Sequence, residues 1–114
     1  MDKLPVMTMT SLKKFRNNNG LKGLVQIHHV IPKSCFTLNS SMFDFKVNNP
    51  SNLLLMPSKK HFYGAHFIHN GPHKKYTEFV KEEIKYIQRE LLLTSFVFFL
   101  RDKLTENDQS IPWN

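Results

Sequence analysis

The pattern of apolar and polar positions divides the chain into two short apolar runs and one long helical segment. Residues 24–31 are rich in β-branched side chains and partly alternate, which predicts a strand that ends at Pro32. Residues 52–56 form a second apolar run between Pro50 and Pro57. We expect this run to be a short strand that returns antiparallel to the first.

A long helical pattern follows Pro72, a residue type that is favoured at the first position of a helix. One face of the pattern is apolar and carries Val80, Ile84, Ile87, Leu91 and Phe98. After Leu91 the pattern is apolar on almost every side. This segment is therefore buried by the rest of the chain, broken into two elements, or used as a subunit interface. The last alternative predicts a homodimer through the apolar carboxy-terminal helix.

The remaining segments carry weaker patterns. Residues 11–16 predict either a short basic helix or a partly ordered tail, before a turn at residues 17–20. Residues 33–51 are expected to form a long loop, and residues 105–114 a polar tail whose tryptophan packs back. Apolar side chains can anchor the long loop on the core: Phe36, Leu38, Met42, Phe43 and Phe45.

The composition fits one small soluble domain, since 114 residues suffice for one modest core. The two expected strands and the helical segment place this domain in the α+β class. We divide the chain into a basic amino-terminal segment (1–23), a domain that includes the carboxy-terminal helix (24–105) and a polar tail (106–114). The net charge of +7 favours a nucleic acid as partner over a membrane surface.

The single cysteine, Cys35, excludes an intramolecular disulfide and a zinc site built from cysteines. It favours an intracellular, reducing compartment such as the cytoplasm or the nucleus, and no signal peptide is seen. The most apolar run, residues 91–100, is too short to span a bilayer.

All six histidines lie between residues 28 and 73, which favours one metal or acid–base site built from short segments. His28 and His29 end the first strand, where their rings can diverge, so that one binds a metal while the other takes a proton from water. His69 and His73 are four residues apart, a spacing that brings two side chains onto one helical face. Three such imidazoles leave coordination positions open, as in a catalytic metal site.

Each of these features also has a simpler explanation. A histidine on an apolar strand is usually a hydrogen-bonded core residue, and two histidines four apart often occur by chance. The adjacent pair Lys74 and Lys75 would ordinarily be a solvated face. The combination of these segments in one small basic domain is more informative than any of them alone.

Three segments together resemble a known family. They are His28-His29-Val30-Ile31-Pro32, then Asn52-Leu53-Leu54-Leu55-Met56-Pro57, then His69-Asn70-Gly71-Pro72-His73-Lys74-Lys75-Tyr76. This order resembles the HNH endonuclease superfamily, whose core is a ββα-metal finger, and within it the AHH-type nucleases. Ile27 stands where those nucleases have alanine. The resemblance covers residues 25 to about 84 and implies a ββα-metal finger with additional helices.

The resemblance also implies roles for individual residues. His28 would be the first metal ligand, His29 the general base, and Asn52 the residue that orients the base. His69 and His73 would be the remaining ligands.

Two assignments stay open at this point. His61 and His66 are alternative ligands, and Asn48 and Asn49 compete with Asn52 for the orienting role unless they only form a turn before Pro50.

The cofactor implied is one divalent metal ion, with Zn, Mg, Mn and Ni as candidates. Imidazole ligands favour the softer ions, whereas members of this superfamily commonly work with Mg. The partner implied is nucleic acid, with DNA favoured over RNA, and we expect low sequence specificity. The lysines expected to contact it are Lys33, Lys59, Lys60, Lys74 and Lys75.

The leading hypothesis is a metal-dependent endonuclease that hydrolyses phosphodiester bonds. A second is a non-catalytic nucleic-acid-binding module that a metal only stabilises, which would need a fourth protein ligand. A third is a small interaction protein whose histidines are merely packed.

Overall fold

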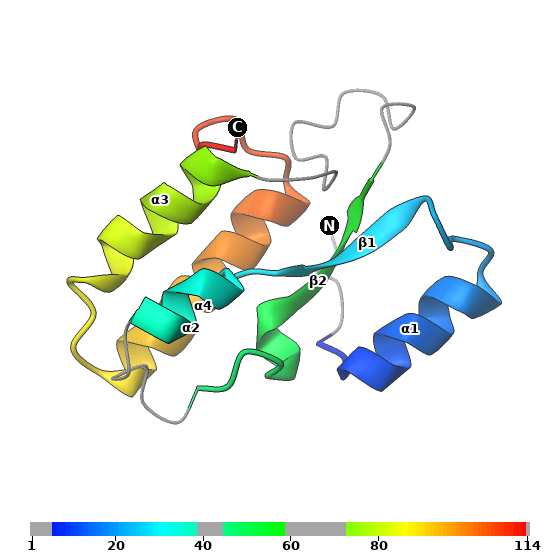
Figure 1. The fold of residues 1–114 in the computed structure, drawn as a ribbon, viewed down its shortest axis with the longest axis horizontal. Coiled ribbons are helices and arrows are strands. Elements are labelled where there is room, and N and C mark those ends of the chain that lie inside the picture. The colour runs from blue at the N-terminus through cyan, green and yellow to red at the C-terminus, as the bar shows by residue number, and fades with distance from the viewer. Residues whose placement is uncertain (1–5, 39–44, 59–72, 114) are drawn as a thin grey trace.

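The structure is a computed structural model, which describes residues 6–38, 45–58 and 73–113 of the chain (Figure 1). Helices surround the sheet that these residues form, which has two strands, β1 (Val25–His29) and β2 (Leu53–Pro57). The strands are antiparallel, with Val25 opposite Pro57 and His29 opposite Leu53. Both predicted strands, their antiparallel pairing and the α+β class are therefore confirmed.

Helix α1 (Met9–Asn18) lies apart from the other helices, across the sheet (Figure 1). The side chain of Thr8 caps its amino-terminal end, because Oγ1 accepts a hydrogen bond of 3.1 Å from the backbone of Ser11. Leu12 is buried, and the turn after the helix places Gly20 at a φ of +66°. Of the two alternatives for residues 11–16, the structure has the short helix.

Residues 33–51 are not one long loop. Helix α2 (Lys33–Leu38) begins directly after Pro32, and a 3₁₀ helix, η1 (Pro50–Asn52), leads into β2. The loop prediction was wrong here because a helix of six residues is too short to show a helical period in the sequence.

Two of the expected anchors of this segment pack together. The rings of Phe36 and Phe45 are stacked with their centroids 6.1 Å apart, and Phe45 is buried. Two further expected anchors, Met42 and Phe43, lie outside the described residues. The segment between the strands is thus fixed on the core at both of its described ends.

The long helical pattern after residue 72 is broken into two helices, α3 (Lys74–Ile84) and α4 (Glu90–Thr105). After α3 the backbone turns more tightly, with hydrogen bonds from Tyr86 to the carbonyl of Glu83 and from Ile87 to that of Ile84. Of the three alternatives for the apolar carboxy-terminal segment, the break into two elements is therefore observed.

The break changes which face of the second helix is buried. Leu91 and Phe98, which a continuous helix would place on the core side, are 76% and 39% exposed. The buried face of α4 instead carries Leu93, Val97, Leu100 and Leu104. Leu92 and Phe99 are exposed as well, and the homodimer expected through this helix stays a prediction.

One hydrophobic core joins the end of β1 to α3, α4 and the carboxy-terminal residues. Trp113 belongs to this core and is buried, so the expectation that the tryptophan packs back is confirmed. None of the helices in the described ranges is both long and apolar enough to cross a membrane.

Candidate active site

Two adjacent histidines at the end of β1 lie in different surroundings. His28 is buried among aromatic rings, whereas His29 is partly exposed and lies beside polar groups. Neighbouring residues of a strand point to opposite faces, and this alternation separates the two imidazoles. The divergence expected from the sequence is therefore present.

The ring of His28 packs against three others, and we call these four residues the aromatic cluster: His28, His73, Tyr76 and Trp113. The centroid of His28 lies 5.1 Å from that of His73, 5.4 Å from that of Tyr76 and 5.3 Å from that of Trp113. The indole of Trp113 stacks on His73 at 4.5 Å, with 27° between the ring planes. Residues from β1, α3 and the carboxy-terminal segment therefore meet at one point.

Tyr76 ties these three segments together through hydrogen bonds. Its hydroxyl donates to the backbone carbonyl of Val30, and its backbone N–H donates to the carbonyl of Trp113 at 3.2 Å. Burial, with a smaller contribution from Cys35, raises the pKa of Tyr76 well above 10. The phenol therefore keeps its proton and acts as a hydrogen-bond donor at neutral pH.

His73 is partly exposed, just before the first turn of α3. Burial lowers its pKa from the ordinary value of 6.5, outweighing a backbone hydrogen bond that raises it. The neutral imidazole, which is the form that binds metals, is therefore favoured at pH 7. The hydroxyl of Thr77 lies 3.4 Å from Nδ1 of His73 and can orient the ring.

The distance between His28 and His73 suits two ligands of one metal ion. Two imidazoles that bind an ion at about 2.0–2.1 Å in a tetrahedral arrangement have ring centroids roughly 5 Å apart. The observed separation is 5.1 Å, with the rings at 76° to each other. Among the described residues no group of three or more possible metal ligands forms, and the third expected ligand, His69, lies outside them.

On the other side of β1, residues 47–52 form what we call the asparagine turn, whose three asparagines have different partners. Oδ1 of Asn48 lies 2.9 Å from Nε2 of His29. Oδ1 of Asn49 accepts from the backbone and the hydroxyl of Ser51, at 3.0 and 2.8 Å, and so shapes the turn itself.

The third asparagine, Asn52, is fully buried and holds the backbone just beyond β1. Its Oδ1 accepts from the backbone of Ile31 at 2.7 Å, while its Nδ2 donates to the carbonyls of Ile31 and Val47 at 3.2 and 2.9 Å. Its own carbonyl accepts from the backbone of Val30 at 2.8 Å. Asn52 thus positions the strand end that carries both histidines, whereas the side chain in direct contact with His29 is that of Asn48.

Arg101 of α4 also holds the asparagine turn in place. Its guanidinium donates to the carbonyls of Ser51 and Leu53, at 3.1 and 2.5 Å, which flank Asn52 in the chain. Burial lowers the pKa of Arg101, with Asp102 opposing the shift, yet arginine stays charged at pH 7. A buried charge therefore fastens η1 and the start of β2 to the last helix.

The lysines expected to bind nucleic acid are only partly within the structure. Lys33, at the start of α2, and the adjacent Lys74 and Lys75 of α3 are exposed. Lys74 and His73 line an open pocket of about 270 Å³ together with Thr77, Glu78 and Lys81. The other expected residues, Lys59, Lys60, His61 and His66, lie outside the described residues.

Sequence reasoning missed two structural partners of the site. Tyr76 stood in the quoted motif without a role, although its spacing of three from His73 places both on one helical face. The sequence did not predict the role of Arg101, because a charged residue in a helix is ordinarily expected to be exposed to solvent. Trp113 was expected to pack back, but not against the histidines.

The sequence model of one protein family matches residues 9–96 of the chain, and its description is a nuclease family of the HNH/ENDO VII superfamily with conserved AHH. Comparison with curated proteins and with solved structures gave no significant match. The matched region contains the His28–His29 pair, the asparagine turn and His73, and it covers most of the chain. The chain therefore belongs to the AHH family of nucleases within the HNH/ENDO VII superfamily.

Proposed function

We propose that this nuclease is a metal-dependent endonuclease that hydrolyses phosphodiester bonds in DNA, with RNA as the alternative substrate, and with low sequence specificity. The observation that carries the proposal is the separation of His28 from His29. One imidazole faces a buried cluster that contains a second histidine, and its neighbour faces solvent and a polar turn. Such a division suits one metal ligand and one general base.

His29 is the proposed general base, and Asn48 supports this role. An amide oxygen only accepts hydrogen bonds, so the contact between Oδ1 of Asn48 and Nε2 of His29 requires the hydrogen on Nε2. Nδ1 of His29 then keeps its lone pair and can take a proton from a water molecule. Asn48 therefore selects the tautomer, and Asn52 acts one step further away by holding the strand end.

His28 and His73 are the proposed metal ligands, with His69 as the third and His61 or His66 as its alternatives. Their separation fits a shared ion, and the neutral form of His73 is favoured. A divalent ion bound there would neutralise charge on the scissile phosphate and on its leaving oxygen. Zn, Mg, Mn and Ni are the candidates to test.

Exposed lysines near the site are proposed to hold the phosphate backbone. Lys33 begins α2 shortly after the end of β1, and Lys74 and Lys75 follow His73 directly. Lys59 and Lys60 are further candidates from outside the described residues. Phosphate contacts carry no sequence information, which is why we expect low specificity.

The test is cleavage of supercoiled plasmid by the purified protein with EDTA, Mg, Mn, Zn or Ni, with His29→Ala beside the wild type. We expect nicking that needs one of the metals and that is lost in His29→Ala, although the variant stays folded and binds metal. Full activity of His29→Ala would refute the role of the base. If the protein shifts DNA but cuts it with no metal, the non-catalytic binding module becomes the better explanation.

A further inference from the structure

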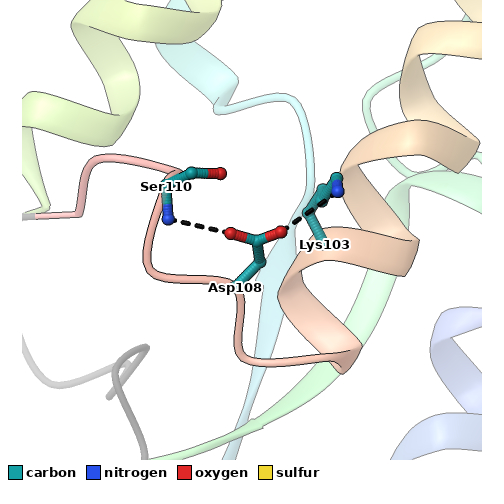
Figure 2. A network of polar contacts seen from close by, with 3 residues as sticks. All are labelled: Lys103, Asp108 and Ser110. Atoms are coloured by element: carbon teal, nitrogen blue, oxygen red, sulfur yellow. Dashed lines mark hydrogen bonds and ion pairs between the residues drawn. The ribbon is translucent and has the colours of Figure 1, made fainter.

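The chain reverses direction after α4 and returns to the active site. Asn107 takes a left-handed conformation with a φ of +56°, which turns the backbone. The carboxylate of Asp108 then accepts from the backbone of Ser110 at 2.8 Å and pairs with Lys103 of α4 at 3.0 Å (Figure 2). These contacts set the direction in which the following residues leave the turn.

The returning segment delivers an indole to the two histidines. Ile111 enters the hydrophobic core, and Trp113 is 3% exposed with its carbonyl bound to the backbone of Tyr76. The indole stacks on His73 and lies 5.3 Å from His28. It is therefore held by its backbone on one side and contacts both imidazoles on the other.

We propose that Trp113 is a positioning residue of the metal centre, which holds the rings of His28 and His73 at the angle and distance needed to share one ion. This inference rests on the proposed metal-binding role of the two histidines. The position lies beyond residues 9–96, the part of the chain that matches the family.

The chemistry of indole restricts what Trp113 can do there. Its N–H only donates, so the side chain offers no lone pair to a metal ion and is not a ligand itself. A flat ring stacked on His73 does limit the rotation of that imidazole, and supporting groups around metal ligands typically change metal affinity by about 10–100-fold. The buried indole also covers the face of His73 against which it stacks.

Metal affinity tests this role without any measurement of activity. We would measure binding of Zn²⁺ by competition with a chromogenic chelator in the wild type, Trp113→Ala and Trp113→Phe. We expect Trp113→Ala to bind about 10–100-fold more weakly and Trp113→Phe to stay within about threefold, because phenylalanine preserves a flat ring at this position. The matched control is Leu104→Ala, which removes a buried core side chain of α4 but should leave metal affinity unchanged.

The wild type offers a second measurement that needs no variant. Trp113 is the only tryptophan of the chain, so the intrinsic tryptophan fluorescence comes from the site alone. Titration with Ni²⁺ should quench it saturably, with the same midpoint as Ni²⁺ binding measured by chelator competition. Metal binding without quenching would overturn the proposal even if Trp113→Ala failed to fold.

The outcomes separate this inference from the proposed function. If Trp113→Ala binds metal as tightly as the wild type, Trp113 is not a positioning residue, while the nuclease proposal stands. If the wild type binds none of the divalent ions, both proposals fail. If Leu104→Ala loses as much affinity as Trp113→Ala, the effect reflects general stability and the inference is overturned.

Discussion

The aromatic cluster and the asparagine turn lie on opposite sides of one short strand, and each holds one of its two histidines by a different kind of interaction. The aromatic cluster holds His28 by packing, with three rings whose centroids lie between 5.1 and 5.4 Å from it. The asparagine turn holds His29 by a polar contact to Asn48 and keeps its own backbone in place through Asn52. One imidazole is thus held by packing against aromatic rings, and the other by hydrogen bonding.

This difference shows how a strand can place two identical residues in different surroundings. Burial keeps water away from His28, whereas partial exposure gives His29 access to water. The separation depends on register, because a shift of one residue would exchange the two faces. Buried Asn52 opposes such a shift, because its side chain binds the backbone of Ile31 just beyond β1.

The largest expected effect comes from removing one histidine at a time. His29→Ala should lower the rate of DNA cleavage by about 10²–10⁴-fold while metal affinity stays the same, because a general base contributes that much. His28→Ala should lose both cleavage and metal binding. Plasmid nicking and chelator competition on the same preparations check this, and equal metal affinity in both variants would contradict the division of roles.

Asn52→Ala and Asn48→Ala should separate stability from activity. Asn52→Ala leaves the buried polar groups of Ile31 and Val47 without their partner, so the free energy of unfolding should fall by about 3 kcal/mol. Asn48 is exposed, and Asn48→Ala should change stability by less than about 0.5 kcal/mol. We expect the rate of cleavage to fall in Asn48→Ala all the same.

Urea unfolding and plasmid nicking of both variants measure the two effects. A stable and fully active Asn48→Ala would show that the contact to His29 has no role in catalysis. A fully stable Asn52→Ala would show that the buried hydrogen bonds do not hold the strand end.

Arg101→Met should have a smaller effect on the asparagine turn. Methionine keeps much of the apolar volume but removes the donors to Ser51 and Leu53, so we expect a loss of about 2 kcal/mol in unfolding free energy. Metal affinity should be unchanged, since Arg101 contacts the turn rather than the aromatic cluster. A variant as stable as the wild type in urea would mean that water replaces the guanidinium.

The smallest effect concerns the turn that returns Trp113 to the site. Hydrogen bonds from Ser110 and Lys103 lower the pKa of Asp108 from 3.8 to about 2. The folded state therefore favours the carboxylate, and its contribution to stability is complete above pH 3.8 and is lost as the pH falls through about 2. Asp108→Asn should flatten the fall of Tm in this window, and identical pH profiles would contradict the assignment.

The elements with a strong local pattern could be predicted from the sequence. Both strands follow from their apolar runs and flanking prolines, and the helix after His73 follows from its spacing of apolar residues. Helix α2 could not be predicted, because six residues show no period. The break before α4 was one of three alternatives, since the apolar pattern continues through it.

The site was predictable where its residues are close in sequence. The pair His28 and His29 diverges as strand geometry requires. The partners of the pair depend on tertiary contacts that no local pattern reveals, such as Asn48 reaching His29 and Arg101 reaching Leu53. Asn52 binds the backbone of Ile31 and Val47, and its expected role in orienting the base stays a prediction.

The contact between Trp113 and His28 also sets the order in which the protein can mature. β1 leaves the ribosome long before residue 113 does, and contacts between distant parts of a chain form late in folding. A nascent chain that ends within α4 already contains every histidine. It lacks Trp113, whose indole contacts His28 and whose carbonyl accepts the backbone N–H of Tyr76. We therefore expect tight metal binding, and with it full nuclease activity, to arise only after residue 113 has left the ribosome.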